Sequence, residues 1–298
     1  MYATAFDYVR ASSWAEASDQ LEQLGEDAHV IAGGQSLVPM MMLRMAAPTA
    51  LIDVGSACER TIELRDGTLQ LSALVRHVDL EHSDAVAVSC PMLTEAVRHI
   101  GNVRVRQRGT IGGSLAHAEA TSELACVALA HQGSVQVLGP AGERTVQAED
   151  LAITHLMTTL DHAEVITGVR LQALTARQGS CFLEMARRAG DFAMVEVAAI
   201  VGLDGEGRCA SARLVVGAVG DKAVDMSQAA QELIGGELTP AATDQVGRAV
   251  ADDVEIGPSS HAGVDYRREM VAVLTGRALR EAARRAGGGQ ADTNGHRP

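Results

Sequence analysis

The stretch AGGQSL, residues 32 to 37, decides how this chain is interpreted, and TIGGSL, residues 110 to 115, repeats its form. The first directly follows the apolar run 29 to 31. Glycine loops of this kind expose backbone N–H groups, and a following helix adds its positive end, so each suits a phosphate. A single loop of this form is also typical of an ordinary strand-to-helix turn. Two such loops without Lys or Arg indicate a diphosphate held by neutral groups, and they exclude a P-loop of the Gly-Lys-Ser/Thr type.

Longer stretches around the two loops are more specific than the loops themselves. They are AGGQSLVPMMMLRMAAPTALIDV at residues 32 to 54, IGNVRVRQRGTIGGSLAHAEATSE at 100 to 123, and RRAGDFA at 187 to 193. Together they resemble the FAD-binding, medium subunit of the molybdenum hydroxylases. That family includes aerobic carbon monoxide dehydrogenase and bacterial dehydrogenases of nicotine-like N-heterocycles. The likeness covers nearly the whole chain except the tail.

The resemblance implies that the two loops hold the diphosphate and ribityl region of FAD. It also implies that an acidic residue contacts the adenine-ribose half, since a carboxylate accepts hydrogen bonds from ribose hydroxyls, and that apolar residues pack near the flavin. The cofactor-binding residues expected on this basis are Ile31, Ala32, Gly33, Gly34, Gln35, Ser36, Leu37, Ile100, Thr110, Ile111, Gly112, Gly113, Ser114, His117, Glu119, Glu123 and Ile166.

Most of these positions also have a plain structural interpretation. Ser36 can be an N-cap of the next helix, Glu123 a first-turn acid, and Ile100 and Ile166 core residues.

The chain departs from the family pattern at two places. Members commonly have His-Ala-Asp-Pro where this chain has HAEA at residues 117 to 120, so the carboxylate of Glu119 is one methylene longer and the proline is lost. Contacts made there by Asp are expected to be displaced. Glu184 stands where some members carry Lys near the flavin. The reversed charge means that no cationic contact with the flavin is carried over.

Composition narrows the remaining function classes. The formal charge of −13 argues against nucleic acid. The arginines between residues 104 and 108 form a local basic cluster, which is typical of a solvated face but also suits a bound anion or a partner subunit. The five cysteines are scattered and cannot ligate an iron–sulfur cluster, and the histidines show no metal-ligand spacing. We therefore expect no metal and no catalytic acid–base set here, because a flavin would carry the chemistry.

Hydrophobic periodicity predicts an α+β protein. Residues 13 to 24 form a capped helix, with Ser13 and Glu16 as a capping box, and 28 to 32 and 50 to 54 are strands. A hairpin turns at Asp66-Gly67. Helices follow at 37 to 45, 91 to 100 and 122 to 131, and strands at 134 to 138 and 164 to 171. A strand meander at 182 to 187, 192 to 203 and 210 to 219 precedes helices at 226 to 234, 240 to 252 and 265 to 285.

The resemblance implies that residues 1 to 175 form an FAD-binding domain of the PCMH/vanillyl-alcohol-oxidase type. It comprises a small parallel α/β unit at about 1 to 56 and a mixed-sheet or antiparallel α+β unit at 57 to 175. A C-terminal domain, with a three-stranded antiparallel sheet and helices, spans 176 to 286. Residues 287 to 298 are polar and glycine-rich and are expected to be disordered.

The function that the resemblance implies is that of an FAD-carrying electron-transfer subunit of a heterotrimeric molybdenum hydroxylase. A large partner would hold the molybdenum-pterin cofactor, and a small partner would hold two [2Fe–2S] clusters, with a dimer of heterotrimers expected. The substrate class would be an N-heterocycle, or a small molecule such as carbon monoxide. A stand-alone flavin-dependent oxidoreductase and a non-enzymatic FAD scaffold are the alternatives. With neither signal peptide nor membrane-length apolar run, we expect a cytoplasmic protein.

Overall fold

The computed structural model describes residues 3 to 288. Its N-terminal unit is a three-stranded parallel sheet of order β1-β3-β2, made of Asp7–Arg10, Ala50–Asp53 and Ala28–Ile31. Helix α1 (Trp14–Leu24) packs against this sheet, and α2 (Leu37–Met42) follows β2. Ser13 caps α1 as predicted, but the carboxylate of Glu16 accepts from the N–H of Ser12. The sequence did not predict β1, because it is short and largely exposed.

The second unit is a five-stranded sheet of order β4-β5-β10-β6-β7, with every pairing antiparallel. Its strands are Ile62–Arg65, Thr68–Ser72, Val165–Gln172, Ser134–Gly139 and Gly142–Gln147. The predicted hairpin at Asp66-Gly67 joins β4 to β5. The helices are α3 (His77–Glu81), α4 (Asp84–Ser89), α5 (Pro91–His99), α6 (Val103–Arg106), α7 (Ile111–His117), α8 (Glu123–Ala130) and α9 (Ala148–Leu151), and a small ribbon pairs β8 (Ala152–Thr154) with β9 (Met157–Thr158).

The C-terminal unit is an antiparallel sheet covered by two helices. Strands β11 (Gln178–Ala186), β12 (Ala193–Leu203) and β13 (Cys209–Gly217) form the predicted meander, and a fourth, two-residue strand β14 (Val224–Asp225) extends it. Helices α10 (Pro240–Asp253) and α11 (Val264–Ala286) were predicted to within two residues. The helix predicted at 226 to 234 is a 3₁₀ helix over Ala229–Leu233.

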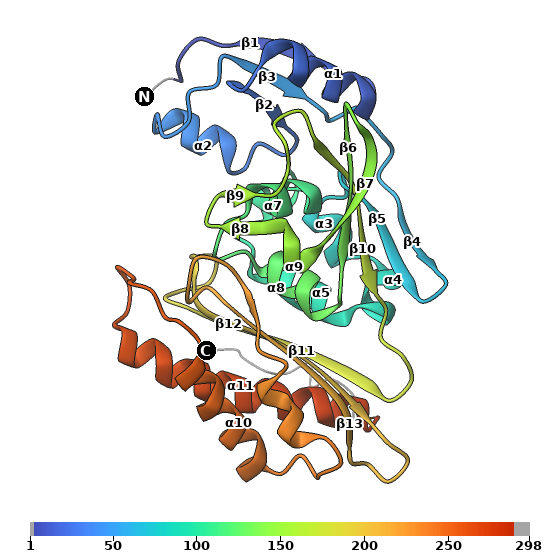
Figure 1. The fold of residues 1–298 in the computed structure, drawn as a ribbon, viewed down its shortest axis with the longest axis vertical. Helices are drawn as coiled ribbons and strands as arrows, with labels where there is room; N and C mark the ends of the chain where they lie inside the picture. Colours follow the sequence, from blue (N-terminus) through green and yellow to red (C-terminus); the bar gives the residue numbers. More distant parts are fainter. Residues whose placement is uncertain (1–2, 289–298) are drawn as a thin grey trace.

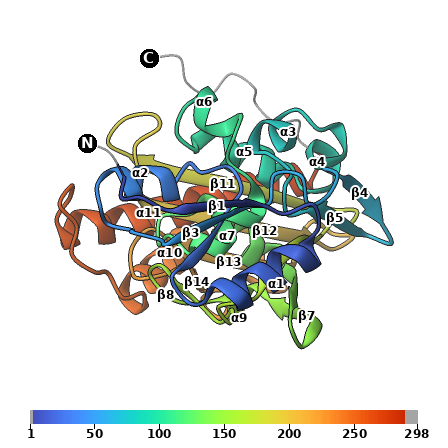
Figure 2. The same cartoon turned by 90° about the horizontal axis from the view of Figure 1, so that it is seen from above.

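The three units are arranged along the long axis of the molecule (Figure 1), and Figure 2 shows the small parallel unit lying over the other two. Helices α5 and α8 lie between the five-stranded sheet and the C-terminal sheet. One apolar cluster runs through this junction, because Phe182 and Val215 of the C-terminal sheet share it with Leu124 and Val127 of α8. The second and third units are therefore joined by continuous packing.

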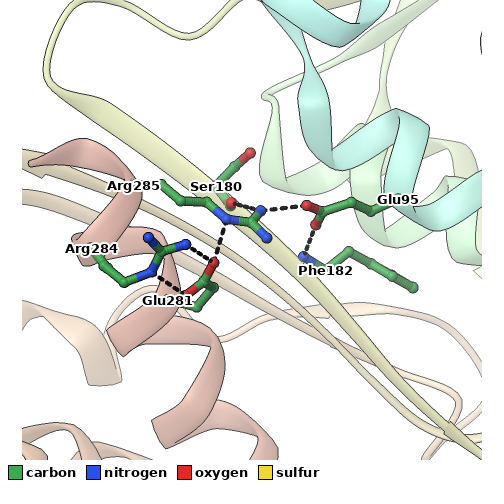
Figure 3. A network of polar contacts seen from close by, with 6 residues as sticks. All are labelled: Glu95, Ser180, Phe182, Glu281, Arg284 and Arg285. Atoms are coloured by element: carbon green, nitrogen blue, oxygen red, sulfur yellow. Dashed lines mark hydrogen bonds and ion pairs between the residues drawn. The ribbon is translucent and has the colours of Figure 1, made fainter. Parts of the chain in front are cut away.

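A polar network also ties these two units together (Figure 3). The guanidinium of Arg285 on α11 forms an ion pair with Glu95 on α5 and donates to the carbonyl of Ser180 at 2.6 Å. The other oxygen of Glu95 accepts the N–H of Phe182 at 2.9 Å. Glu281 holds Arg285 from the far side at 2.7 Å, and the hydrogen bond from Arg284 is the main cause that lowers the pKa of Glu281 to about 2. The charges of this network are therefore paired at neutral pH.

The last predicted segment lies almost wholly outside the described residues. Gly287 and Gly288 form a turn after α11, and the prediction of disorder for the tail concerns residues 289 to 298, which are not described. Between residues 3 and 288, no helix has both the length and the apolar character needed to cross a bilayer.

Candidate functional site

The first glycine loop lies between β2 and α2 and leaves its backbone donors without partners. Within the described chain, the N–H groups of residues 33 to 36 donate no hydrogen bond. Gly34 adopts the left-handed conformation, with φ of +70°, which glycine tolerates without strain. Ser36 stands at the N-cap position of α2, as the structural interpretation predicted, but its side chain makes no capping hydrogen bond with the described residues. This loop therefore offers amide donors and an exposed hydroxyl.

The two glycine loops lie against each other. A Cβ atom built on Gly33 would overlap the backbone carbonyl of Arg108 and approach the Cα of Gly109 within 2.8 Å. Only a glycine at position 33 allows this approach. The sequence predicted two loops serving one diphosphate, and the fold brings the first loop to the start of the second.

The second loop differs from the expected form, because Gly112 and Gly113 lie inside the first turn of α7 and their amides are engaged. The N–H of Ile111 donates to the carbonyl of Val75, and that of Gly112 to the carbonyl of Ala73, both at 3.0 Å. Thr110 caps the helix, since its hydroxyl accepts from Gly113 at 3.2 Å and its carbonyl from Ser114 at 3.0 Å. The expectation that both loops expose free amides therefore holds for the first loop alone.

A buried histidine that the sequence did not single out stands behind the second loop. The Nε2 atom of His77 lies 3.1 Å from the hydroxyl of Ser114, and the backbone N–H of His77 donates to Gly109 at 3.1 Å. His77 is 3% exposed, and burial lowers its pKa to about 4. A histidine in the sequence RHVDL carries no local signal for this role.

The basic cluster before the second loop divides into internal and exposed members. Arg106 forms an ion pair with Glu81 at 2.9 Å and donates to the carbonyl of Ile100 at 3.1 Å. Arg104 and Arg108 are exposed and make no ion pair within residues 3 to 288. The backbone carbonyl of Arg108 faces Gly33, so Arg108 itself lies beside the first loop.

The segment that departs from the family pattern follows α7 directly. His117 is the last residue of α7, and burial lowers its pKa. Nδ1 of His155 lies 3.5 Å from the Glu119 carboxylate and 3.4 Å from the backbone nitrogen of Ala120, and it can serve only one of them at a time. The carboxylate of Glu119 therefore lies beside the turn between β8 and β9.

The predicted apolar positions share one core. Ile166 on β10 is 6% exposed and Ile111 is 2% exposed, and both belong to the cluster against which Ile100 packs. The N–H of Ala73 donates to the carbonyl of Thr167 on β10, and the N–H of Gly112 donates to the carbonyl of Ala73. Strand β10 therefore also supports the second loop. Ile100, Ile111 and Ile166 therefore belong to the packing that holds the second loop in place.

Glu123 reaches a buried group of three carboxylates. It starts α8, and one oxygen each from Glu123, Glu184 on β11 and Glu196 on β12 lie within 4.8 Å of one another. Glu196 is fully buried, and the side chain of Glu184 is 3% exposed. One carboxylate oxygen of Glu184 and one of Glu196 have no hydrogen-bond partner among the described residues. The thiol of Cys126 donates to Glu196 at 3.1 Å.

Glu123 is half-buried beside the buried side chains of Glu184 and Glu196, and three carboxylates this close cannot all be ionised. Burial, and then the neighbouring Glu184, raises the pKa of Glu123 to about 8. Burial and Glu123 raise the pKa of Glu196 well above its usual range. Half-exposed His99, 3.6 Å from Glu184, is the nearby basic group. The group therefore holds protons at neutral pH.

Models of two protein families match this chain. The FAD binding domain in molybdopterin dehydrogenase matches residues 4 to 172, and the CO dehydrogenase flavoprotein C-terminal domain matches 180 to 282. The fold and the loops together thus define the class of FAD-binding subunits of molybdopterin dehydrogenases.

Curated relatives agree over nearly their full lengths. The chain is 36% identical to subunit alpha of the 6-hydroxypseudooxynicotine dehydrogenase complex of Paenarthrobacter nicotinovorans, covering 96% of this chain and 97% of the relative. It is 32% identical to the carbon monoxide dehydrogenase medium chain of Hydrogenophaga pseudoflava, covering 95% and 98%. The chain belongs to this family, that of the FAD-binding medium subunits of the molybdenum hydroxylases, and is an oxidoreductase subunit.

Solved structures extend the agreement to three dimensions. Quinoline 2-oxidoreductase from Pseudomonas putida 86 superposes with a TM-score of 0.91 at 32% identity, covering 96% of this chain and 99% of that one. A carbon monoxide dehydrogenase from Hydrogenophaga pseudoflava that lacks the Mo-pyranopterin moiety of its cofactor superposes with a TM-score of 0.91 at 32% identity. The match covers 95% of this chain and 98% of that one. The predicted α+β fold with its C-terminal antiparallel sheet is confirmed.

The residues present fit FAD on two observations. The unpartnered amides of residues 33 to 36 are donors for a diphosphate. The surface around Gly33 leaves no room for a side chain between the two loops. The hydroxyls of Ser36 and Ser114 add further donors.

Proposed function

We propose that this chain is the FAD-carrying electron-transfer subunit of a heterotrimeric molybdenum hydroxylase. It would take electrons from the [2Fe–2S] clusters of a small partner, after substrate hydroxylation at the molybdenum-pterin cofactor of a large partner, and pass them to an external acceptor. The single observation that supports this most is the first loop, where four consecutive N–H groups find no partner among residues 3 to 288 and Gly33 packs against the start of the second loop. When bound, FAD supplies the electron-accepting chemistry.

The site that we propose has two parts. Residues 31 to 37 bind the diphosphate through backbone amides and the Ser36 hydroxyl, and residues 110 to 114 contribute mainly the Ser114 hydroxyl, because their amides are engaged. His117, Glu119 and Glu123 are the further proposed FAD contacts of the second unit. Ile100 and Ile166 would pack near the flavin.

The partner arrangement rests on the family and on what this chain lacks. Its five cysteines are all free, and four of them are buried, so they offer no iron–sulfur ligand set. We therefore assign the clusters and molybdenum to partners, as a dimer of heterotrimers. We place the protein in the cytoplasm and divide the chain near residue 175, between the two matched family models.

The substrate class that we propose is an N-heterocycle. The relatives include a nicotine 6-hydroxylase medium subunit, 35% identical, and a caffeine dehydrogenase subunit beta, 28% identical. Carbon monoxide dehydrogenase medium chains, at 32% and 29% identity, support a small molecule as the alternative. Substrate screening of the native complex, copurified through this chain with metal analysis, distinguishes the two.

Cofactor binding is tested by the absorbance of the purified chain and of its acid supernatant. We expect one FAD per chain, released into the supernatant because it is held non-covalently. FMN in place of FAD, or flavin retained in the precipitate, would contradict the proposal.

The electron-transfer role is tested by anaerobic mixing with candidate heterocycles. We expect the flavin of the isolated chain to stay oxidised, and to bleach when the molybdenum and iron–sulfur partners are added. Bleaching in the isolated chain would favour the stand-alone oxidoreductase. Absence of bleaching in the active complex would favour a non-enzymatic scaffold.

A further inference from the structure

His77 joins both ends of the second glycine loop from behind. His77 is the buried first residue of α3. Its backbone N–H donates to the carbonyl of Gly109, just before the loop. Its ring reaches Ser114, at the end of the loop, with Nε2 3.1 Å from the hydroxyl oxygen. The imidazole therefore contacts the one loop residue whose hydroxyl is not used as a helix cap.

The Ser114 hydroxyl is the main polar group that this loop can offer to an anion. The amides of residues 111 to 114 all donate within the protein, and the hydroxyl of Thr110 accepts from Gly113. A serine hydroxyl has a single proton. If Ser114 donated that proton to His77, its oxygen would face an anion with lone pairs only, which is repulsive.

The surroundings of His77 decide the direction of this hydrogen bond. Its Nδ1 atom is buried and has no hydrogen-bond partner within the described chain. A buried N–H without a partner is rarer and costlier than a lone pair without one. The ring proton therefore belongs on Nε2, which faces the Ser114 hydroxyl at 3.1 Å, and the backbone of Thr110 is a second hydrogen-bond partner of the ring in the same loop. Burial, which lowers the pKa of His77 to about 4, keeps the ring neutral at physiological pH.

We propose that His77 is a positioning residue of the FAD site, whose Nε2–H fixes the Ser114 hydroxyl so that the serine proton points at the FAD diphosphate. This inference rests on the proposed function, in which residues 110 to 114 contact that diphosphate. Gly109 supports the arrangement, because a Cβ there would lie 2.7 Å from Cε1 of the His77 ring. The glycine leaves the imidazole the space that it needs behind the loop.

A double-mutant cycle on the full-length apo-chain, titrated with FAD by flavin fluorescence, tests this role. We expect Ser114→Ala and His77→Leu each to weaken FAD binding by about tenfold, the effect of one lost hydrogen bond to a charged group. The double variant should bind no more weakly than His77→Leu alone. His77→Gln, which keeps an N–H donor, should bind within about threefold of the wild type.

A second variant covers the case in which His77→Leu fails to fold by circular dichroism. Gly109→Ala should displace the His77 ring and weaken FAD binding when Ser114 is present. In a chain that already carries Ser114→Ala, it should leave the FAD affinity unchanged. Independent losses that multiply to about a hundredfold in the double variant, or wild-type affinity in His77→Leu, would overturn the role of His77. A wild-type apo-chain that bound no FAD would overturn the proposed function itself.

Discussion

The two glycine loops share their sequence form but differ in what they leave for a ligand. The N–H groups of residues 33 to 36 donate no hydrogen bond to any described residue, whereas those of residues 111 to 114 donate to Val75, Ala73 and Thr110. The first loop precedes a six-residue helix, while the second opens a helix whose Ile111 and Leu115 belong to the main apolar core. Similar sequences therefore leave different groups for a ligand: free backbone amides in the first loop and mainly the Ser114 hydroxyl in the second.

The region after the second loop also differs from the first loop, because it leads to a group of closely spaced carboxylates that must hold protons in the folded protein. Glu123 opens α8 four residues after Glu119 and meets two carboxylates of the C-terminal sheet in a buried place. Among the described residues, no such group of carboxylates lies at the first loop. The comparison predicts that pH acts on stability through the second region and that ligand affinity depends most on the first.

The largest effect is expected for Glu123→Gln on the pH dependence of unfolding of the apo-chain. The folded pKa of about 8 exceeds the unfolded one, so the wild-type carboxyl keeps a proton in the folded state that the unfolded chain releases. The stability of the wild type relative to the variant should be unchanged below about pH 4.5. It should then fall by about 1.4 kcal/mol for each pH unit up to pH 8.

Chemical denaturation at each pH measures this difference. Glu22→Gln, on the exposed face of α1, is the matched control and should show no such slope. A stability difference between wild type and Glu123→Gln that does not change with pH would show that the three carboxylates are not coupled to folding.

The second effect concerns Gly33→Ala, compared with Gly113→Ala. A methyl group at position 33 overlaps the Arg108 carbonyl and forces the two loops apart, at about 1–3 kcal/mol. We expect FAD affinity to fall by about a hundredfold. At the exposed Gly113, a methyl meets only the Thr110 hydroxyl, at 2.9 Å, so the loss should be several-fold smaller. Equal losses in two folded variants would contradict the difference between the loops.

Sequence alone predicted the elements that periodicity and turn chemistry determine. The α1 cap, the Asp66-Gly67 hairpin and the long C-terminal strands and helices carry strong local patterns, and the family resemblance supplied the fold. It missed β1, because a short exposed strand has no apolar alternation. Periodicity predicts a regular helix at residues 226 to 234 because a 3₁₀ helix, here Ala229–Leu233, shares much of the same pattern.

The cofactor-binding positions remain a prediction, and the sequence did not predict the hydrogen bonds of the two loops. Whether an amide is free depends on carbonyls far away in sequence, such as that of Ala73 for Gly112. His77 and Glu196 were missed for the same reason, because their partners Ser114 and Glu123 lie at long range. Local patterns cannot report such tertiary contacts.

A smaller effect is expected for Thr110→Ala, which removes the helix cap of the second loop. The Thr110 hydroxyl accepts from Gly113 at 3.2 Å, so its loss should lower the free energy of unfolding by about 1 kcal/mol. Urea denaturation of the apo-chain measures this value. Thr110→Ser, which retains the hydroxyl, is the control and should keep most of the stability. An unchanged stability in Thr110→Ala would mean that this loop is not held by its cap.

The smallest effect is expected for Ser36→Ala, the counterpart of Thr110→Ala in the first loop. Ser36 makes no capping hydrogen bond and is exposed, so its removal should leave the unfolding free energy of the apo-chain unchanged. If its hydroxyl donates to the diphosphate, FAD affinity should fall by about threefold to tenfold. Fluorescence titration and urea denaturation of the same preparation give both numbers. A loss of stability with unchanged affinity would assign Ser36 to the helix and leave the first loop to bind through its amides alone.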